Sequence, residues 1–365
     1  MKIGILSMQE VANYGSYLQA YALKRILEGL GADEVFFINI TKGRQIKELG
    51  GGRLNKLLRL FKILIQGRVF KRIKDARFFH RLDKSFEDKL EMIGTTTTDI
   101  KSLDLIVIGS DEVFNCCQVS GWGFTTQLFG DIPCANRIIS YAGSFGNTTY
   151  EKLEKYNLTG EIRNSLSNLS EISVRDENSS AIIKKLGFNP ILHVDPVLAW
   201  KWDAELANIS LINREYILLY SYPGRFKDKN EIDEIIRFSK DTNLPIVPIL
   251  SEYEWCEDTV FPEPPMDVLK YFKSAKYVIT DTFHGSILSV ICKKQFCVYV
   301  RESNKQKMTS LMHRLMLSER IYENKGDLSS KLRQEIDYDS VEQILDLERN
   351  KTKDYLLKYI KYDSI

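Results

Sequence analysis

KIGILSMQEVANYGSYLQAYALKRILEGLGADEVFFINI, residues 2–40, begins with an apolar run from Ile3 to Leu6 that is short enough for a buried strand. A mostly polar loop follows over residues 8–16, and apolar residues then recur at the three- and four-residue spacing of one helix face: Leu18, Ala22, Leu23, Ile26, Leu27 and Leu30. Gly31 stands where that helix would stop, and Val35 to Ile40 has the composition of another strand. The stretch therefore predicts a strand, a loop, a helix and a second strand in succession.

Similar units recur along the chain. Further short apolar runs predict strands at Leu105–Ile108, Ile138–Tyr141, Ile172–Val174, Tyr216–Tyr222, Pro245–Leu250, Tyr277–Thr280 and Phe296–Val300. Helical segments are predicted between the later strands, through Met266–Phe272 and from Gly285. This alternation predicts an α/β fold in which helices cover both faces of parallel sheets.

We expect two Rossmann-like, doubly wound domains with the junction near residues 200–213. The predicted N-terminal domain covers 1–205, the C-terminal domain covers 206–335, and 336–365 forms a C-terminal helical tail. Ligands of such folds bind at the carboxyl ends of the strands, so the cleft between the domains is the expected site.

Composition limits the class of protein. Of the 365 residues, 44% are apolar and 27% are charged, an ordinary globular mixture that excludes collagen-like, disordered and coiled-coil classes. The formal net charge of +2 gives no argument for a nucleic-acid partner. The six cysteines show no C-x-x-C spacing, and the first apolar run is followed by no cleavage-site pattern, so we expect a reducing, cytoplasmic location.

A basic segment interrupts the alternation. Residues 42–84 contain 14 Lys or Arg against three acidic residues, and Leu54 to Ile65 has the spacing of a basic amphipathic helix. One interpretation is peripheral contact with anionic lipid at the inner face of the membrane, or with an anionic glycan. The other is a solvated helix whose apolar face packs on its own domain.

Among the four histidines, His284 is the best placed for chemistry. It lies in VITDTFHGS, residues 278–286, where a predicted strand ends and a helix begins, and free N–H groups at a helix start favour anions. Gly285 permits close approach of the backbone, and Asp281 or Ser286 is a candidate to orient the imidazole or to cap the helix. The alternative is a partly buried histidine that only hydrogen-bonds a loop.

Two arginines also follow predicted strands. Arg175 comes directly after the Ser-Val pair of a short strand, where a guanidinium can bind a carboxylate or phosphate with paired donors. An ion pair with Asp176, with Glu177 or with another domain is the alternative. Arg301 repeats the arrangement after a later strand, with Lys307 nearby. These positions predict an anionic ligand.

The loop GSDEVFN, residues 109–115, offers the carboxylates Asp111 and Glu112 for general-base work or for holding a hydroxyl-rich acceptor. A turn with an Asp helix cap would explain the same residues. Loops with comparable placement add Ser110, Ser144, Asn13, Tyr14 and Gly15 as candidate binding residues. No H-E-x-x-H, no paired C-x-x-C and no G-x-G-x-x-G after the first strand occurs, so a metal or dinucleotide site is not expected.

Taken in order, these motifs resemble the polysaccharide pyruvyl transferase family. The resemblance spans residues 1–322, and it rests on the ordered series rather than on any single motif. The matching segments are NYG at 13–15, GSD at 109–111, SYAGS at 140–144, SVRD at 173–176, DP at 195–196 and TDTFHG at 280–285.

The resemblance implies a GT-B-like arrangement, with the acceptor on the first domain and the donor on the second. It implies transfer of a pyruvyl group from phosphoenolpyruvate, with no further cofactor, to a sugar as a ketal bridging two hydroxyls. The acceptor would be a surface or capsular polysaccharide or its lipid-linked precursor. The family's anion-binding arginine matches Arg175, and its Asp-x-x-His-Gly histidine matches His284. Because an unperturbed histidine titrates at about pH 6.5, His284 is the expected proton donor or relay. Asp111, Glu112 and Asp281 are the candidate bases.

One departure from the family concerns the donor. Many members carry Arg-Leu before the histidine, where this chain has Thr282-Phe283, and Arg301 or Lys307 would then have to supply the charge. Two further functions are kept as alternatives. One is a GT-B glycosyltransferase that uses a nucleotide sugar, and the other is a non-catalytic glycan-binding protein.

Overall fold

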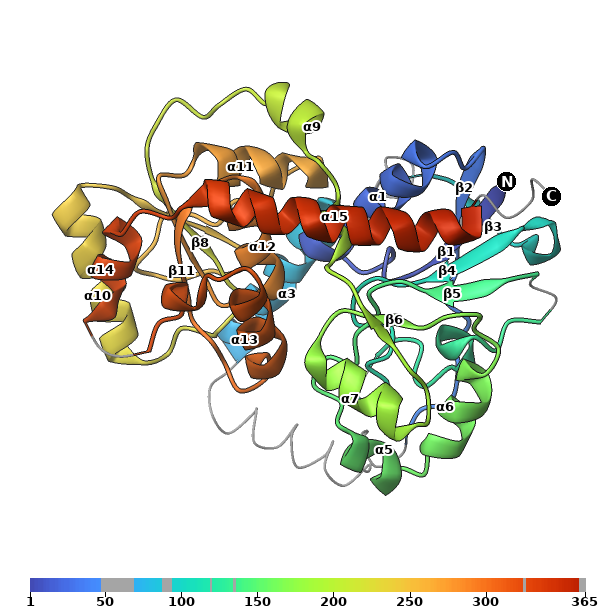
Figure 1. Ribbon diagram of the computed structural model, residues 1–365. Helices are drawn as coiled ribbons and strands as arrows, with labels where there is room; N and C mark the ends of the chain where they lie inside the picture. Colours follow the sequence, from blue (N-terminus) through green and yellow to red (C-terminus); the bar gives the residue numbers. More distant parts are fainter. Residues whose placement is uncertain (47–68, 87–93, 119, 134–135, 324–325, 361–365) are drawn as a thin grey trace. The chain divides into compact units, whose positions relative to one another are not determined.

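The computed structural model describes residues 1–46, 69–86, 94–118, 120–133, 136–323 and 326–360 (Figure 1). The chain divides into two compact units. The first contains Met1–Ala12 and Leu27–Leu192, and the second contains Asn13–Ile26 and His193–Lys361. In the second half of the chain, the boundary between the units therefore lies between Leu192 and His193. The sequence predicts this junction further along the chain, near residues 200–213.

The first unit is built on a five-stranded parallel sheet. Its strands are β1 Lys2–Leu6, β2 Glu34–Ile38, β3 Thr96–Thr97, β4 Leu105–Ile108 and β5 Ile138–Ser140, in the order β3-β2-β1-β4-β5. The chain runs outward from β1 to β3 and then returns to the other side of β1, so the switch point lies between β1 and β4. This is the doubly wound topology that the sequence predicts.

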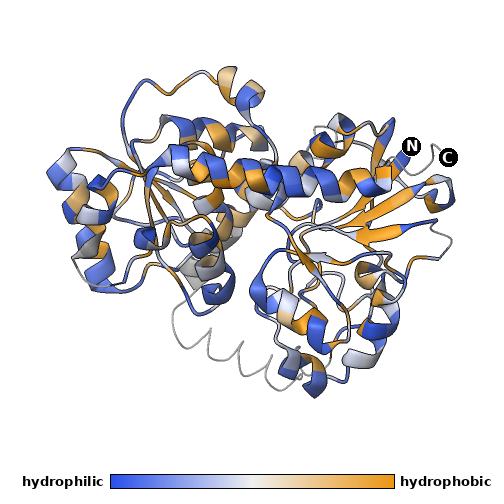
Figure 2. Ribbon diagram, in the orientation of Figure 1, coloured by the Kyte–Doolittle hydropathy of each residue, from blue (hydrophilic) through white to orange (hydrophobic). Residues whose placement is uncertain are grey.

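Burial explains why the central strands read as continuous apolar runs. All four residues of β4, sequence LIVI, are buried, as are all three of β5, because helices and loops cover both faces of a parallel sheet. Both strands are hydrophobic along their length in Figure 2. Phe114, Phe129 and Phe145 form the aromatic centre of the adjoining core, with the Phe114 ring 5.3 Å from each of the other two.

Two short strands extend this unit. β6 Ser173–Val174 pairs in parallel with β7 Ile191–Leu192, and single bridges link Gly143 to Val174 and Ile139 to Glu171, so that β6 lies beside β5. The helices of the unit are α3 Val69–Lys84, α5 Tyr150–Lys155, α6 Thr159–Leu166 and α7 Glu177–Lys185, with short 3-10 turns at Ile100–Ser102 and Thr126–Phe129.

The second unit holds a four-stranded parallel sheet in the order β11-β10-β8-β9. The strands are β8 Ile217–Tyr220, β9 Ile246–Ile249, β10 Tyr277–Thr280 and β11 Gln295–Val298. The chain adds β9 on one side of β8 and β10 on the other. The switch point of this sheet therefore lies between β8 and β10, and ligands of open α/β sheets bind at the carboxyl ends of such strands.

Helices surround this second sheet. They are α8 Pro196–Ala199, α9 Asp203–Ala207, α10 Lys229–Thr242, α11 Val268–Ser274, α12 Phe283–Ile291, α13 Lys305–Arg314, α14 Asp327–Arg333 and α15 Tyr338–Ile360, with 3-10 turns at Pro265–Asp267 and Ser318–Arg320. Every residue of α12 from Phe283 to Val290 is buried, which fits its mostly apolar sequence. α15 alternates polar and apolar faces (Figure 2) and packs against α8.

α1 Tyr14–Gly29 begins earlier than predicted. The sequence predicts a loop over residues 8–16, but Asn13 caps the helix: its Oδ1 accepts a hydrogen bond from Gly15 N at 2.8 Å. The prediction was therefore wrong at this boundary. As a result, the NYG motif forms the first turn of a helix and not part of a loop.

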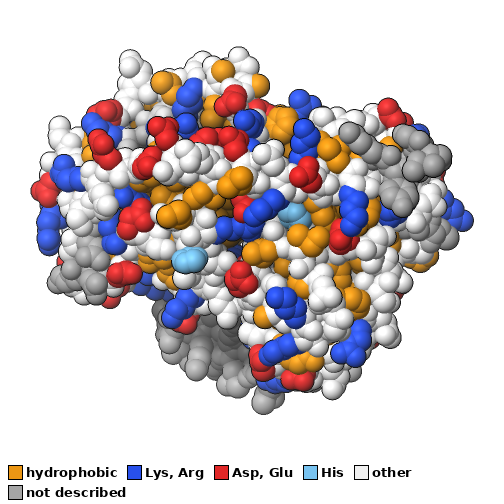
Figure 3. Space-filling view, viewed as in Figure 1, with side chains coloured by type: hydrophobic (Ala, Val, Ile, Leu, Met, Phe, Trp, Pro, Cys, Tyr) orange, Lys and Arg blue, Asp and Glu red, His pale blue; other side chains and the backbone are white. Residues whose placement is uncertain are grey.

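The basic segment is described only in part. Residues 47–68, which include the predicted amphipathic helix, lie outside the described residues. In α3, Phe78 and Leu82 are buried while Phe79 is half exposed. Among the described helices, none combines the length and apolar character needed to span a membrane. On the face drawn in Figure 3, basic and acidic side chains are interspersed, in keeping with the small net charge.

Candidate functional site

His284 lies at the start of α12, directly after β10. Thr282 caps the helix, because its hydroxyl oxygen accepts a hydrogen bond from Gly285 N at 2.9 Å. The prediction that Asp281 or Ser286 provides the cap was therefore wrong; the Ser286 hydroxyl donates instead to the carbonyl of Thr282 at 3.1 Å. Gly285 is needed here, since a Cβ would lie 2.1 Å from the Thr280 hydroxyl.

A buried carboxylate faces the imidazole. His284 Nε2 lies 3.6 Å from Asp195 Oδ2, the Asp195 side chain is fully buried, and only 8% of His284 is exposed. The other carboxylate oxygen of Asp195 accepts a hydrogen bond from Val197 N at 3.0 Å and so caps α8, which contacts α12. A residue that sequence reasoning did not place in the site thus comes closest to its main candidate. Asp195-Pro196 does carry a helix-start signal, but that signal says nothing about the partner.

The first turn of α1 packs directly on the His284 ring. A Cβ added to Gly15 would lie 2.1 Å from Nδ1 and 2.2 Å from Cγ, so only glycine fits. Asn13 Nδ2 donates to the Tyr222 hydroxyl at 2.9 Å, and the Tyr14 hydroxyl donates to the carbonyl of Pro262 at 3.3 Å. We call Asn13, Gly15, Asp195, Tyr222 and His284 the His284 cluster. It brings three predicted residues to the switch point of the second sheet.

We expect Gly15→Ala to lower kcat/KM by about 10²-fold, because the new methyl group must displace the imidazole and a shift of about 1 Å can cost that much. Steady-state kinetics measure the effect. Gly29→Ala in the same helix is the matched control: a Cβ there meets nothing within 4 Å, so activity should stay within about twofold. Equal rates in the two variants would contradict the tight packing of Gly15 on His284.

Arg301 and Asp281 form a neighbouring ionic network. Arg301 donates from both terminal nitrogens to Glu231, at 2.7 and 2.9 Å, and its Nε lies 3.7 Å from Asp281 Oδ2. Burial raises the pKa of Asp281, and the Ser221 hydroxyl and the Arg301 and Arg225 guanidinium groups oppose that rise. The Arg301 side chain is thus largely engaged within the protein. Lys307 Nζ lies over the Phe283 ring, 5.6 Å from its centre, and places a second cation beside the start of α12.

A second group, the Arg175 cluster, lies at the carboxyl ends of β4, β5 and β6 in the first unit. It contains Ser110, Asp111, Ser144, Arg175 and Asp176. Arg175 Nη2 lies 3.5 Å from Asp111 Oδ1, and both residues are buried. The Ser144 hydroxyl donates to Asp176 at 2.5 Å, and Asp176 caps α7 by accepting from Ser179 N at 2.8 Å. The acidic partner that the structure shows for Arg175 is thus Asp111, which comes from a different strand end and is not one of its chain neighbours.

The loop after β4 has an unusual backbone. Asp111 has φ of 73°, in the left-handed region that few non-glycine residues adopt, and it begins no helix within the described stretch 109–118. The alternative of an Asp helix cap is therefore wrong. The Ser110 hydroxyl donates to the carbonyl of Ala142 at 2.9 Å, and Glu112 accepts from Asn115 Nδ2 at 2.6 Å. Backbone strain of this kind is often found at functional sites.

The other buried histidine of the second unit is unsuited to acid catalysis. The His193 ring contacts the Tyr355 ring in a tilted arrangement, with ring centres 4.6 Å apart. Burial, helped by the charge of Arg314, lowers the pKa of His193 to about 4, so it is neutral near pH 7. Among the described residues, no cluster of three or more His, Cys, Asp or Glu side chains is arranged to hold a metal ion.

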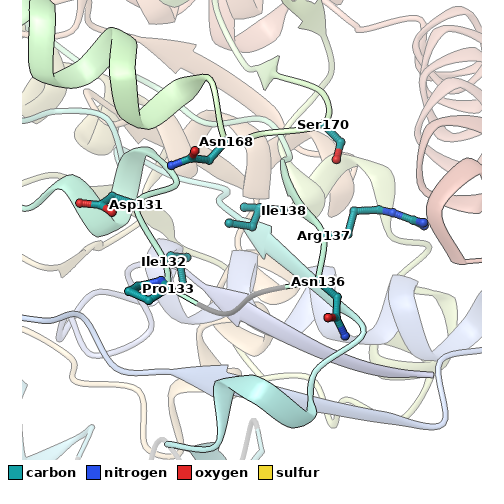
Figure 4. Close-up of a pocket in the computed structure, with 8 residues that line it drawn as sticks. All are labelled: Asp131, Ile132, Pro133, Asn136, Arg137, Ile138, Asn168 and Ser170. Atoms are coloured by element: carbon teal, nitrogen blue, oxygen red, sulfur yellow. The ribbon is translucent and has the colours of Figure 1, made fainter.

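A separate hollow of about 470 Å³ lies in the first unit where β5 begins (Figure 4). It is lined by Asp131, Ile132, Pro133, Asn136, Arg137, Ile138, Asn168 and Ser170. None of the predicted site residues contributes to this lining. The predicted residues that the structure places at strand ends lie at the carboxyl ends, whereas this hollow adjoins the amino end of β5.

Fold and site together define an α/β protein with two Rossmann-like units and polar clusters at the carboxyl ends of parallel strands. The family model of polysaccharide pyruvyl transferases matches residues 13–303, and the chain belongs to this family. The protein is thus a transferase of polysaccharide pyruvylation in general terms. The family predicted from the ordered motifs is confirmed.

Several solved structures are similar in fold. The UDP-GlcNAc 2-epimerase of Methanocaldococcus jannaschii is 12% identical, with 99% of this chain and 100% of that chain covered and a TM-score of 0.48. The O-GlcNAc transferase of Thermobaculum terrenum is 10% identical, with 99% and 66% covered and a TM-score of 0.47. The UDP-GlcNAc 2-epimerase of Neisseria meningitidis is 11% identical, with 98% and 94% covered and a TM-score of 0.46. No curated protein matches the chain in sequence. Similarity at this level says nothing about its substrate.

Proposed function

We propose that the protein transfers the pyruvyl group of phosphoenolpyruvate to two hydroxyls of a sugar, as a ketal, in a polysaccharide or its lipid-linked precursor. The observation that carries this proposal is the His284 imidazole beside the buried Asp195 carboxylate, at the end of β10. Ketal formation from an enol phosphate requires proton transfer, and histidine is the side chain best suited to it near neutral pH. Family membership supports the reaction class.

The donor carries a phosphate and a carboxylate, so its site must supply positive charge or free N–H groups. Arg175 is proposed to bind one of the anionic groups with its planar guanidinium. Lys307 adds a cation beside the start of α12, where Gly285 and Ser286 are the candidate contacts. Their N–H groups already donate to the hydroxyl and the carbonyl of Thr282, so a donor anion would have to compete for them. Arg301 donates to Glu231 from both terminal nitrogens, so it could contact phosphoenolpyruvate only by exchanging this carboxylate for the substrate.

The proposed chemistry has two steps. In the first, His284 protonates the methylene carbon and a sugar hydroxyl attacks the adjacent carbon, which adds O–H across the double bond; the hydroxyl proton passes to a base, for which Asp111, Glu112 and Asp281 are the candidates. In the second, another hydroxyl attacks the same carbon, and phosphate leaves with the electron pair of its C–O bond and with the hydroxyl proton. The products are a pyruvate ketal and inorganic phosphate, and no cofactor is consumed.

The test is incubation of the full chain with phosphoenolpyruvate and a panel of glycosides that carry suitably spaced pairs of free hydroxyls. We expect acceptor-dependent phosphate release, together with a product mass equal to acceptor plus pyruvate minus water. Omitting the acceptor gives the background rate. Consumption of a nucleotide sugar instead would assign glycosyl transfer. Glycan binding with no turnover of either donor would show that the chain is a glycan-binding protein. Either of these two results would overturn the proposal.

A further inference from the structure

We infer that Asp195 is the positioning residue of the proton donor: it holds the proton of His284 on Nε2 and leaves Nδ1 to exchange protons with the substrate. The inference rests on the proposed function for its catalytic consequence. Its structural part, the pairing of these two side chains, stands on geometry alone.

Within the part of the chain that the structure describes, Nε2 of His284 lacks a hydrogen-bond partner but lies close to an acid. This nitrogen is buried, and among the described residues no atom forms a hydrogen bond with it. A buried polar atom without a partner is costly, and the nearest acid is Asp195 Oδ2 at 3.6 Å. Catalytic hydrogen bonds are often long before the substrate binds and shorten in the complex. A small rotation of the ring would therefore complete an Nε2–H hydrogen bond to the carboxylate.

The side chain of Asp195 is held in place by the helix that it caps. Its other oxygen accepts from Val197 N and caps α8, so the carboxylate cannot turn away without uncapping that helix. Pro196 follows at the first helical position, where its fixed φ is already helical. The side chain is fully buried, so solvent does not compete for it. One carboxylate oxygen thus anchors the residue while the other faces the imidazole.

Nδ1, on the opposite side of the His284 ring from Nε2, has different surroundings. Nδ1 lies against the first turn of α1, where a Cβ on Gly15 would come within 2.1 Å of it. That turn is the NYG segment, where Asn13 Oδ1 accepts from Gly15 N and Ser16 N and so holds the helix start in place against the ring. Asn13 continues this edge by its hydrogen bond to Tyr222. Nε2 faces the buried Asp195 carboxylate, so a substrate that reaches the ring would meet Nδ1 rather than Nε2.

The proton balance follows from this arrangement. In the imidazolium form, Nδ1–H gives its proton to the methylene carbon of the donor while Nε2–H stays with Asp195. The neutral ring that results has its lone pair on Nδ1. The proton that the base takes from the attacking hydroxyl returns to this nitrogen. The imidazolium is then restored. Asp195 is never protonated in this scheme; it fixes the tautomer and the orientation of the ring, as in other carboxylate–histidine pairs.

Asp195→Asn tests the inference because the helix cap dictates how the new amide is oriented. The amide oxygen must accept from Val197 N, which turns the NH₂ group toward Nε2 and forces this nitrogen to act as an acceptor. The neutral ring should then carry its proton on Nδ1. We expect kcat to fall about 10- to 100-fold while KM for phosphoenolpyruvate stays within about twofold. Asp337→Asn, at the exposed cap of α15, removes the same charge from another helix start and should leave kcat within about twofold.

A measurement without substrate separates this inference from the proposed function. In full-length protein labelled with ¹⁵N-histidine, the four side chains can be assigned by single replacements. We expect the Nε2–H tautomer for His284 in the native chain and in Asp337→Asn, and the Nδ1–H tautomer in Asp195→Asn. An unchanged tautomer in Asp195→Asn, or Nδ1–H in the native chain, overturns the inference. If no variant turns over phosphoenolpyruvate, the proposed function fails while the tautomers still decide the role of Asp195.

Discussion

His284→Gln should lower kcat for pyruvyl transfer by about 10²- to 10⁴-fold, the usual contribution of a positioned acid–base group. The glutamine amide can still reach toward Asp195, so the buried carboxylate keeps a donor and the loss is that of a titratable proton. Since the start of α12 is held by Thr282 and not by the histidine, the helix should remain in place. Phosphate release at saturating phosphoenolpyruvate gives kcat, and circular dichroism checks the fold.

The control for this variant is His313→Gln. His313 is exposed near the end of α13, in the same unit, and no role in the site is assigned to it. Its kcat should stay within about twofold of the native value. A His284→Gln enzyme that keeps a tenth or more of the native kcat would remove the histidine from the chemistry and leave the proton donor to be sought elsewhere.

Much of the fold is readable from the sequence because the central strands are buried on both faces. The apolar runs at Leu105–Ile108 and Tyr277–Thr280 coincide with β4 and β10, and the polar residues that follow them do lie at strand ends. The rule that functional groups follow the carboxyl ends of parallel strands selects His284 and Arg175 as candidates, and the structure places both at such strand ends. The local pattern is enough to predict these strands, because a short apolar run bounded by polar turns is typical of a buried central strand in an α/β fold.

Pairing between distant segments is what the sequence does not reveal. Asp195 meets His284 because α8 packs against α12, and Gly15 meets the same ring because α1 begins at Tyr14, inside the stretch predicted as a loop. Likewise, Arg301 is engaged by Glu231 from α10, so a cation that looks available in the sequence is held by an acidic partner. Each of these outcomes is decided by tertiary packing and leaves no trace in residue spacing.

Arg175→Ala should have two separable effects. The first is on stability: the variant leaves Asp111 as a buried charge without its arginine, and breaking a buried ion pair typically costs about 3–5 kcal/mol of the free energy of unfolding. The second is on the donor. Loss of a charged hydrogen bond is worth about 1.5–3 kcal/mol, so KM for phosphoenolpyruvate should rise at least about tenfold. Urea unfolding and steady-state kinetics measure the two effects.

Arg314→Ala shows which part of the loss is structural. Arg314 pairs with the buried Glu348 at 2.6 Å, so its removal also breaks a buried ion pair, but no part of the site depends on it. This variant should be destabilised to a comparable degree while its KM for phosphoenolpyruvate stays within about twofold. Arg175→Lys adds a second comparison, because it keeps the charge but lacks the planar fork, and should fall between native and Arg175→Ala in KM. If Arg175→Ala were destabilised like Arg314→Ala with no rise in KM, Arg175 would be a structural partner of Asp111 and would not bind the donor.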